Sequence, residues 1–447
     1  MSYMLFRLAY RFKRPNVLRY YDEFMKTQWF EYEKILENAD KQLKNIVDYA
    51  NTYVPYYNTL FAEYGISPES IESIEDLQRI PILTKDIIKK NFEEFTPKNI
   101  KSLRFITNTT GGSTGVPLKY RMSLEDYERG IALLYRGWSY AGYKLGDKSA
   151  VIAGTSLIPN IKTDFSRKIF NFFLNQRNYS SYNLSEENLY KYLKNLNSWK
   201  PEFIRGYVSS IFLFAKFVHD NRLVVKFRPK AIITTSEKLF KYQRELMEGV
   251  FNSEVFDTYG LNDGGVSAYE CSMHKGLHID TERAILEVVD ENDRQIFDKP
   301  GKILATSLYN YALPFIRYDT GDIGVLSSEK CDCGRETFLL KEIIGRATDS
   351  LTLNGVNIGS PVLTVLMGRF DIQQYQIVQE SESSITIKIV KGEHFSKDDE
   401  DFIRKSFYNH VGNIDIKFEY VNSIMPFKGQ KHKFIINNLT LNQMDEE

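Results

Sequence analysis

The chain has 447 residues, of which 43% are hydrophobic and 26% are charged, with 58 basic side chains against 58 acidic ones. This length predicts two or more domains, and the apolar content excludes a disordered protein. Because the charges balance, no overall field would attract nucleic acid or anionic lipid, and no nucleic-acid partner is expected.

The N-terminal segment, MSYMLFRLAYRFKRPNV, interleaves apolar and basic residues and lacks the apolar stretch of a signal peptide. No run of about eighteen apolar residues, which a membrane-spanning helix needs, occurs in the sequence. We expect a cytoplasmic protein without a transmembrane segment. The first segment is expected to be a helix that packs on the body of the protein or makes peripheral contact with a membrane surface.

The first hundred residues are predicted to be mostly helical, with apolar positions three to four residues apart in 28–53. Ser73 and Asp76 mark one helix start, and Thr84 is the predicted N-cap of a helix beginning at Lys85. From about residue 150, short apolar runs such as SAVIAG and KAIITTS alternate with helical patterns, which predicts α/β layers with buried strands.

Residues 277–328 read as strands joined by turns, which predicts an antiparallel, barrel-like segment. The last hundred residues give a β-β-α-β pattern that can stand as a separate domain. The predicted fold class is therefore α/β: a large N-terminal domain of several subdomains over 1–346, followed by a small, mobile α+β domain over 347–447.

A glycine-rich stretch, NTTGGSTGVPLKY at 108–120, has the hydroxyls and backbone N–H groups to hold an oxyanion, but it fits neither standard phosphate-loop template. Two further stretches suit a nucleotide. In RYDTGD, the carboxylate of Asp322 could bind a ribose diol or simply be solvated in a hairpin turn. In TYGLNDGG, Tyr259 suits a stacked ring and Asp263 a metal or phosphate, although the stretch is equally a strand end and a turn.

The three cysteines of the chain are too few for a disulfide scaffold and suit a reducing compartment. Cys331 and Cys333 form a C-x-C turn, and Cys271 is followed by His274 and His278. Three thiolates and one imidazole make a closed tetrahedral zinc set, which is structural because no position remains for water. His278 is the preferred fourth ligand over His274, and three unconnected thiols are the alternative.

Near the C-terminus, Lys428, Lys431 and Lys433 surround Gly429. They form either a solvated basic turn or a site from which one lysine reaches an anion and stabilises the charge that develops on it.

Taken together, these stretches resemble the adenylate-forming (acyl-CoA synthetase-like) superfamily, and within it the phenylacetate-CoA ligase and CapK-like branch, over about residues 50–440. The resemblance implies that the TTGGSTGVP loop wraps the β- and γ-phosphates of ATP, with Thr114 also catalytic, and that ITTSEKL contributes to the nucleotide site. The implied ATP-binding residues are Thr110, Gly111, Gly112, Ser113, Thr114, Gly115, Ser236, Glu237, Tyr259, Gly260, Asp322 and Arg346.

The resemblance also implies that Asp263 is a catalytic residue that holds magnesium, at a position where the family has glutamate. Lys431 matches the adenylation lysine, although Gly429-Gln430-Lys431 stands where the family has Gly-Lys, and Lys428 is the fallback. Asp349 matches the hinge of the C-terminal domain. The cysteine stretches resemble the branch's zinc-type insertion.

The expected function is ATP-dependent activation of a small-molecule carboxylate as an acyl-adenylate, followed by transfer to an acceptor. Coenzyme A would give a thioester. An amine, such as an amino sugar or amino acid, would give an amide, for example in surface-polysaccharide biosynthesis. The alternatives are a non-catalytic nucleotide-binding homologue and an adenylyl transferase. ATP, Mg²⁺ and structural Zn²⁺ are the expected cofactors, with coenzyme A a further candidate.

Overall fold

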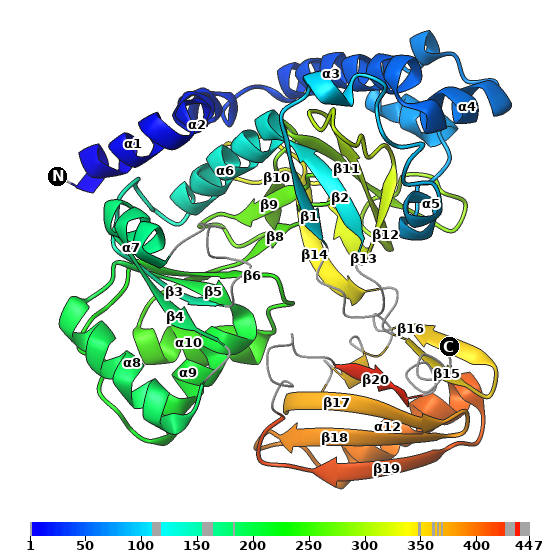
Figure 1. Cartoon of the computed structure of the whole chain (residues 1–447). Coiled ribbons are helices and arrows are strands. Elements are labelled where there is room, and N and C mark those ends of the chain that lie inside the picture. Colours follow the sequence, from blue (N-terminus) through cyan, green and yellow to red (C-terminus); the bar gives the residue numbers. More distant parts are fainter. Residues whose placement is uncertain are drawn as a thin grey trace. The chain divides into compact units, whose positions relative to one another are not determined.

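The computed structural model describes residues 2–109, 118–153, 164–181, 184–346, 350–359, 363, 366–367, 370–424 and 434–438. The chain forms two compact units (Figure 1). The larger unit comprises Met1–Leu239, Arg244–Thr320 and Gly324–Glu342, and the smaller unit comprises Phe240–Gln243, Gly321–Ile323 and Ile343–Glu447. The domain boundary near 346 stays a prediction.

The N-terminal part of the larger unit is helical, as predicted. Its helices are α1 (Ser2–Lys13), α2 (Pro15–Thr27), α3 (Tyr32–Tyr53), α4 (Pro55–Glu63) and α5 (Lys85–Lys90), with short 3-10 helices at Pro68–Ser70, Ile74–Arg79 and Ile100–Ser102. The Thr84 hydroxyl accepts a hydrogen bond from the Ile87 backbone N–H at 3.3 Å, which confirms the predicted N-cap. Ser73 and Asp76 form a capping box, but the helix that they start is 3-10.

Helix α1 packs on the larger unit through one face, because Phe6 and Tyr10 are buried against Tyr135. The other face leaves Met4 77% and Leu8 42% exposed. Packing on the body is thus confirmed, and peripheral membrane contact stays a prediction. Within the part of the chain that the structure describes, no helix combines the length and apolarity that a membrane crossing needs.

A parallel five-stranded sheet in the order β4-β3-β5-β6-β7 forms one layer of the larger unit (Figure 1). Its strands are β3 (Ser149–Ala153), β4 (Gln176–Ser180), β5 (Phe203–Tyr207), β6 (Ala231–Thr235) and β7 (Val255–Phe256). The connecting helices are α7 (Asp164–Phe173), α8 (Glu186–Trp199), α9 (Val208–Asp220) and α10 (Lys241–Phe251). The predicted α/β layers with buried strands are confirmed.

A second sheet has seven strands in the order β11-β12-β13-β14-β10-β9-β8. They are β8 (Thr258–Gly260), β9 (Ser267–Glu270), β10 (Leu277–Ile279), β11 (Ala284–Val289), β12 (Pro300–Ser307), β13 (Tyr318–Leu326) and β14 (Leu339–Arg346). β8 with β9, β9 with β10, β10 with β14, and β11 with β12 pair antiparallel. The pairing of β11 with β12 lies within 277–328 and confirms the antiparallel strands predicted there. Barrel-like closure stays a prediction.

The hairpin of β1 (Phe105–Thr109) and β2 (Lys119–Ser123) precedes α6 (Leu124–Ser139). Figure 1 shows the hairpin near the seven-stranded sheet. The contact is specific, because Asn310 from the turn after β12 accepts the Ser123 N–H at 2.9 Å and donates to the Arg121 carbonyl at 3.0 Å.

The smaller unit contains β15 (Ser350–Leu353), β16 (Val356–Gly359), β17 (Ile372–Ser381), β18 (Ser384–Lys391), α12 (Lys397–Val411), β19 (Asp415–Tyr420) and β20 (Ile435–Asn437). Its four-stranded sheet has the order β19-β18-β17-β20. The predicted β-β-α-β pattern corresponds to β17, β18, α12 and β19 and is confirmed. A capping box of Ser396 and Asp399 starts α12, which buries Ile403 and Phe407 in the core of this unit.

The core of the larger unit also contains ion pairs. Arg283 binds the Asp126 carboxylate through two nitrogens at 2.9 and 2.8 Å, and both side chains are almost fully buried. Arg317 binds Glu287 at 3.2 Å, and these two side chains are also almost fully buried. Since a buried guanidinium is unfavourable without a partner, each pair favours one position of α6 or of the strands relative to the residues that it contacts.

Replacing Asp126 by asparagine is expected to lower the free energy of unfolding by about 3–5 kcal/mol, because Arg283 would remain buried without a carboxylate. The matched control is Glu125→Gln in the Glu125–Arg129 pair, where the Glu125 side chain is 46% exposed and the change should stay within about 1 kcal/mol. Urea unfolding followed by circular dichroism measures both. Equal effects of the two substitutions would contradict the assignment of a stabilising buried pair.

Candidate active site and metal-binding cluster

The glycine-rich loop connects the two strands of the β1–β2 hairpin, whose last registered pair is Thr109 with Lys119. The predicted phosphate-binding residues Thr110, Gly111, Gly112, Ser113, Thr114 and Gly115 lie outside the described residues. The strand residues that flank the loop, here called the hairpin base, include Tyr120, which pairs with Asn108 and is buried in the core of the larger unit.

Three stretches that are distant in sequence converge at Asp263. The Tyr318 hydroxyl, at the start of β13, donates a hydrogen bond to Asp263 Oδ2 at 3.0 Å, and both residues are buried. Burial raises the pKa of Tyr120 well above its usual value, and the nearby charge of Asp263 adds to the effect. The hairpin base, the TYGLND stretch and the RYDTGD stretch therefore meet around one carboxylate.

Gly264, which follows Asp263, allows the tight turn at this site. Its φ of +94° lies in the left-handed region, and a Cβ atom there would lie 2.8 Å from Ala305 Cβ and 3.3 Å from the Tyr318 ring. Only glycine satisfies both the backbone conformation and the lack of space. The turn therefore brings Asp263 close to β13.

Ser236 and Glu237 follow the carboxyl end of β6. Ser236 has a φ of +70°, which is uncommon for a residue with a side chain. The Glu237 carboxylate accepts the Ser209 N–H at 2.7 Å and the Ser209 hydroxyl at 3.0 Å. Since α9 begins at Val208, Glu237 caps the N-terminus of that helix, a structural contact that the sequence did not indicate.

The other predicted nucleotide-site residues are dispersed. Tyr259 is partly exposed and Gly260 is exposed on β8, whereas Asp322 is buried on β13. The backbone of Arg346 ends β14, and its side chain is not described. Asp349, Lys428 and Lys431 lie outside the described residues.

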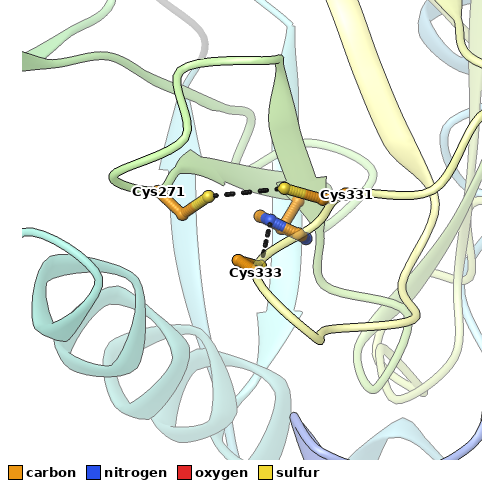
Figure 2. Close-up of side chains that lie close together, drawn as sticks. Cys271, Cys331 and Cys333 are labelled. Atoms are coloured by element: carbon orange, nitrogen blue, oxygen red, sulfur yellow. Dashed lines mark hydrogen bonds between the residues drawn. The ribbon is translucent and has the colours of Figure 1, made fainter.

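A second cluster consists of Cys271, His278, Cys331 and Cys333, whose ligand atoms all lie within 4.8 Å of one another (Figure 2). Cys271 follows β9, His278 lies on β10, and the other two come from the turn between β13 and β14. His274 does not join them. Its Nδ1 lies 3.0 Å from Glu270, which also binds Arg244, and this carboxylate raises the pKa of His274.

The geometry of the cluster fits a tetrahedral metal ion. The sulfurs of Cys271 and Cys331 are 3.7 Å apart, and Cys333 Sγ is 3.3 Å from His278 Nε2. Metal–sulfur bonds of about 2.3 Å and metal–nitrogen bonds of about 2.0–2.1 Å give tetrahedral edges of about 3.8 and 3.5 Å. A disulfide would require about 2.05 Å. The four side chains therefore form a set that could bind a metal.

The residues around His278 keep its ring in the neutral form that can bind a metal ion. Burial, together with the positive charges of Arg335 and Arg136, lowers the pKa of His278 to about 4, so the ring is neutral at pH 7. His278 Nδ1 lies 2.9 Å from the Thr337 hydroxyl. This contact orients the ring and leaves Nε2 directed at Cys333, as is common for histidines that bind metal.

The chain is similar to several known proteins. A family model described as the CapK C-terminal domain matches residues 351–438. Protein CapK of Staphylococcus aureus is 28% identical over 96% of this chain and 94% of its own length. Phenylacetate-coenzyme A ligase of Thermus thermophilus is 25% identical over 88% of this chain and 86% of its own. A crystal structure of 2-hydroxyisobutyryl-CoA ligase in the postadenylation state, in complex with 2-HIB-AMP, matches with a TM-score of 0.68 and 19% identity over 92% of each chain.

These similarities confirm the predicted resemblance: the chain is similar in sequence to CapK and to phenylacetate-coenzyme A ligase, and it has the fold of 2-hydroxyisobutyryl-CoA ligase. The match of residues 351–438 to the CapK C-terminal domain adds to the similarity to CapK.

Replacing Glu237 by alanine is expected to lower the free energy of unfolding by about 1 kcal/mol, because two donors at the start of α9 lose their acceptor. Glutamine should lose less, since its amide oxygen still accepts. Glu291→Ala, at an exposed turn, serves as the control. If the Glu237 and Glu291 variants have the same urea midpoint, the capping role is wrong.

Proposed function

We propose that the protein activates a carboxylic acid with ATP and transfers the acyl group to an acceptor. A carboxylate oxygen of the acid attacks the α-phosphorus of ATP, the bond to the bridging oxygen breaks, and pyrophosphate leaves. The acyl-adenylate is then attacked at its carbonyl carbon by the acceptor, and AMP leaves. The observation that carries this proposal is the convergence of the hairpin base, Asp263 and Tyr318 in a chain that resembles ligases over most of its length.

The chemistry requires little covalent work from the protein, so positioning and neutralisation of charge supply most of the rate enhancement. We assign the triphosphate to Thr110, Gly111, Gly112, Ser113, Thr114 and Gly115. The loop would hold pyrophosphate as it leaves, and Lys431 would stabilise negative charge on the α-phosphorus. Ser236, Glu237, Tyr259, Gly260, Asp322 and Arg346 are assigned to the rest of the nucleotide.

Asp263 is the residue that we assign to Mg²⁺, which would neutralise phosphate charge when bound. Its carboxylate is buried and accepts the Tyr318 hydrogen bond through Oδ2. Aspartate is a common ligand of Mg²⁺, which usually keeps several waters, and this suits a side chain shorter than the family's glutamate.

The smaller unit is proposed to rotate about Asp349 after adenylation, which would remove Lys431 and admit the acceptor. The similarity of residues 351–438 to the CapK C-terminal domain supports its assignment as a separate module. Coenzyme A is supported as acceptor by the names of the ligase relatives. An amine acceptor in surface-polysaccharide biosynthesis is the alternative.

Lysine 431 provides the first test. Purified protein should exchange labelled pyrophosphate into ATP with a suitable carboxylic acid, and Lys431→Ala should reduce that exchange about a hundredfold or more, because charge on the phosphorus loses its cation. Lys428→Ala is the matched control and should retain exchange. Loss in the Lys428 variant alone would move the role to that residue. ATP binding without exchange across a broad acid panel would favour a non-catalytic homologue, and a product carrying AMP would favour an adenylyl transferase.

The cysteine cluster is proposed to hold one structural zinc ion. Metal analysis of protein purified without chelators should give about one zinc per chain, and Cys333→Ala should lose most of it, because only three ligands would remain. His274→Ala should keep the metal, since that ring binds Glu270 instead. Metal loss in the His274 variant but not in a His278 variant would contradict the ligand assignment.

A further inference from the structure

Among the described residues of the larger unit, four arginines are buried, and three of these have carboxylate partners. Arg136 binds Asp280 and Glu282, Arg283 binds Asp126, and Arg317 binds Glu287. Because a charge removed from water is costly unless it is paired, these contacts show how the chain normally satisfies a buried guanidinium.

Arg205, on β5, differs from the other three. It is 9% exposed, and within the described part of the chain it has no carboxylate partner. Its guanidinium lies over the Trp138 ring, 3.6 Å from the centroid, and donates one hydrogen bond of 2.8 Å to Gln176 Oε1. Its Nε has no hydrogen-bond partner there, as is also the case for Arg136 Nε. Burial lowers the pKa of Arg205, and Tyr143, Tyr135 and Tyr10 only partly oppose this.

The position of Arg205 in the sheet points to a ligand. Val151 on β3, Arg205 and Ile233 on β6 lie side by side in register, two residues before β5 ends. In parallel α/β sheets, ligands bind outside the carboxyl ends of the strands. The predicted nucleotide-site residues Ser236 and Glu237 follow β6 at this same edge.

We propose that Arg205 receives a second anionic group of the carboxylate substrate. The acid would carry one carboxylate that reacts with ATP and a further carboxylate that pairs with the guanidinium. The rings of Trp138 and Tyr143, which contact each other at 5.5 Å, would cover the carbon skeleton between the two. This inference rests on the proposed function for the identity of its ligand, and it specifies the substrate class as a dicarboxylic acid.

The test compares acids that differ only in the second carboxylate. Thermal unfolding and tryptophan fluorescence of the full chain are measured with succinate, adipate or terephthalate, and with butyrate, hexanoate or benzoate, at equal ionic strength. At least one dicarboxylate should raise the unfolding midpoint and change the fluorescence, whereas its monocarboxylate counterpart should not. An equal response to both members of every pair, or no response to any dicarboxylate, overturns the proposal.

Variants test whether the response to dicarboxylates depends on Arg205. Arg205→Gln should weaken the dicarboxylate response about tenfold or more, because the buried partner charge is removed, and Arg205→Lys should retain part of it. Arg177→Gln is the matched control, since Arg177 lies on the same sheet and stacks over Trp199 at 4.6 Å but is exposed. A wild-type response in Arg205→Gln overturns the proposal. If Arg205→Gln does not fold, the wild-type comparison of acids and the lysine variant still decide.

Pyrophosphate exchange distinguishes a failure of the proposed role of Arg205 from a failure of the proposed function. Exchange with monocarboxylates that is unchanged in Arg205→Gln, and no exchange with dicarboxylates, would refute the role of Arg205 and leave the proposed function intact. Dicarboxylate binding that depends on Arg205 but supports no exchange would refute the proposed function alone.

Discussion

A buried ion pair between Arg317 and Glu287 is linked to Asp263 through Tyr318, the residue that follows Arg317. Arg317 also donates to the backbone carbonyl of Ile80 at 3.1 Å, so it joins β11 to the segment after the second 3-10 helix. This anchor fixes the first residue of β13, Tyr318, which then directs its hydroxyl at Asp263. The ion pair in the core is thus connected to the Asp263 carboxylate through the Arg317–Tyr318 peptide bond and the Tyr318 hydrogen bond. The candidate active site is arranged around this carboxylate.

Short-range features of the fold could be predicted from the sequence because their causes are local. The Thr84 cap and the β-β-α-β order of the smaller unit depend on residues that are neighbours in the chain. The full extent of the antiparallel sheet could not be predicted. β10 pairs with β9 and with β14, whereas β11, which follows it directly, pairs with β12. Such pairing is set by packing between distant segments, and no local pattern contains it.

In the candidate sites, too, local features could be predicted and contacts between distant segments could not. Types of residue were visible in the sequence, but the direction of each side chain was not. The contact of His274 with Glu270 favours His278 as the fourth ligand. Glu270 lies four residues before His274, a spacing that could have been noticed in the sequence. Tyr318 contacts Asp263 in the turn between β8 and β9, and Arg205 contacts Trp138 on α6. Because these partners are distant in the sequence, only burial and contact in three dimensions distinguish the two residues from ordinary core residues.

The cysteine cluster connects two hairpin ends that are far apart in the chain, since Cys271 and Cys331 are separated by 60 residues. A metal ion bound by both would hold these two hairpin ends together in the folded chain. Because the four ligands come together only on folding, the metal would bind the folded chain in preference to the unfolded one, and its binding free energy would add to the free energy of unfolding. The cluster would then stabilise the folded chain without any change at Asp263.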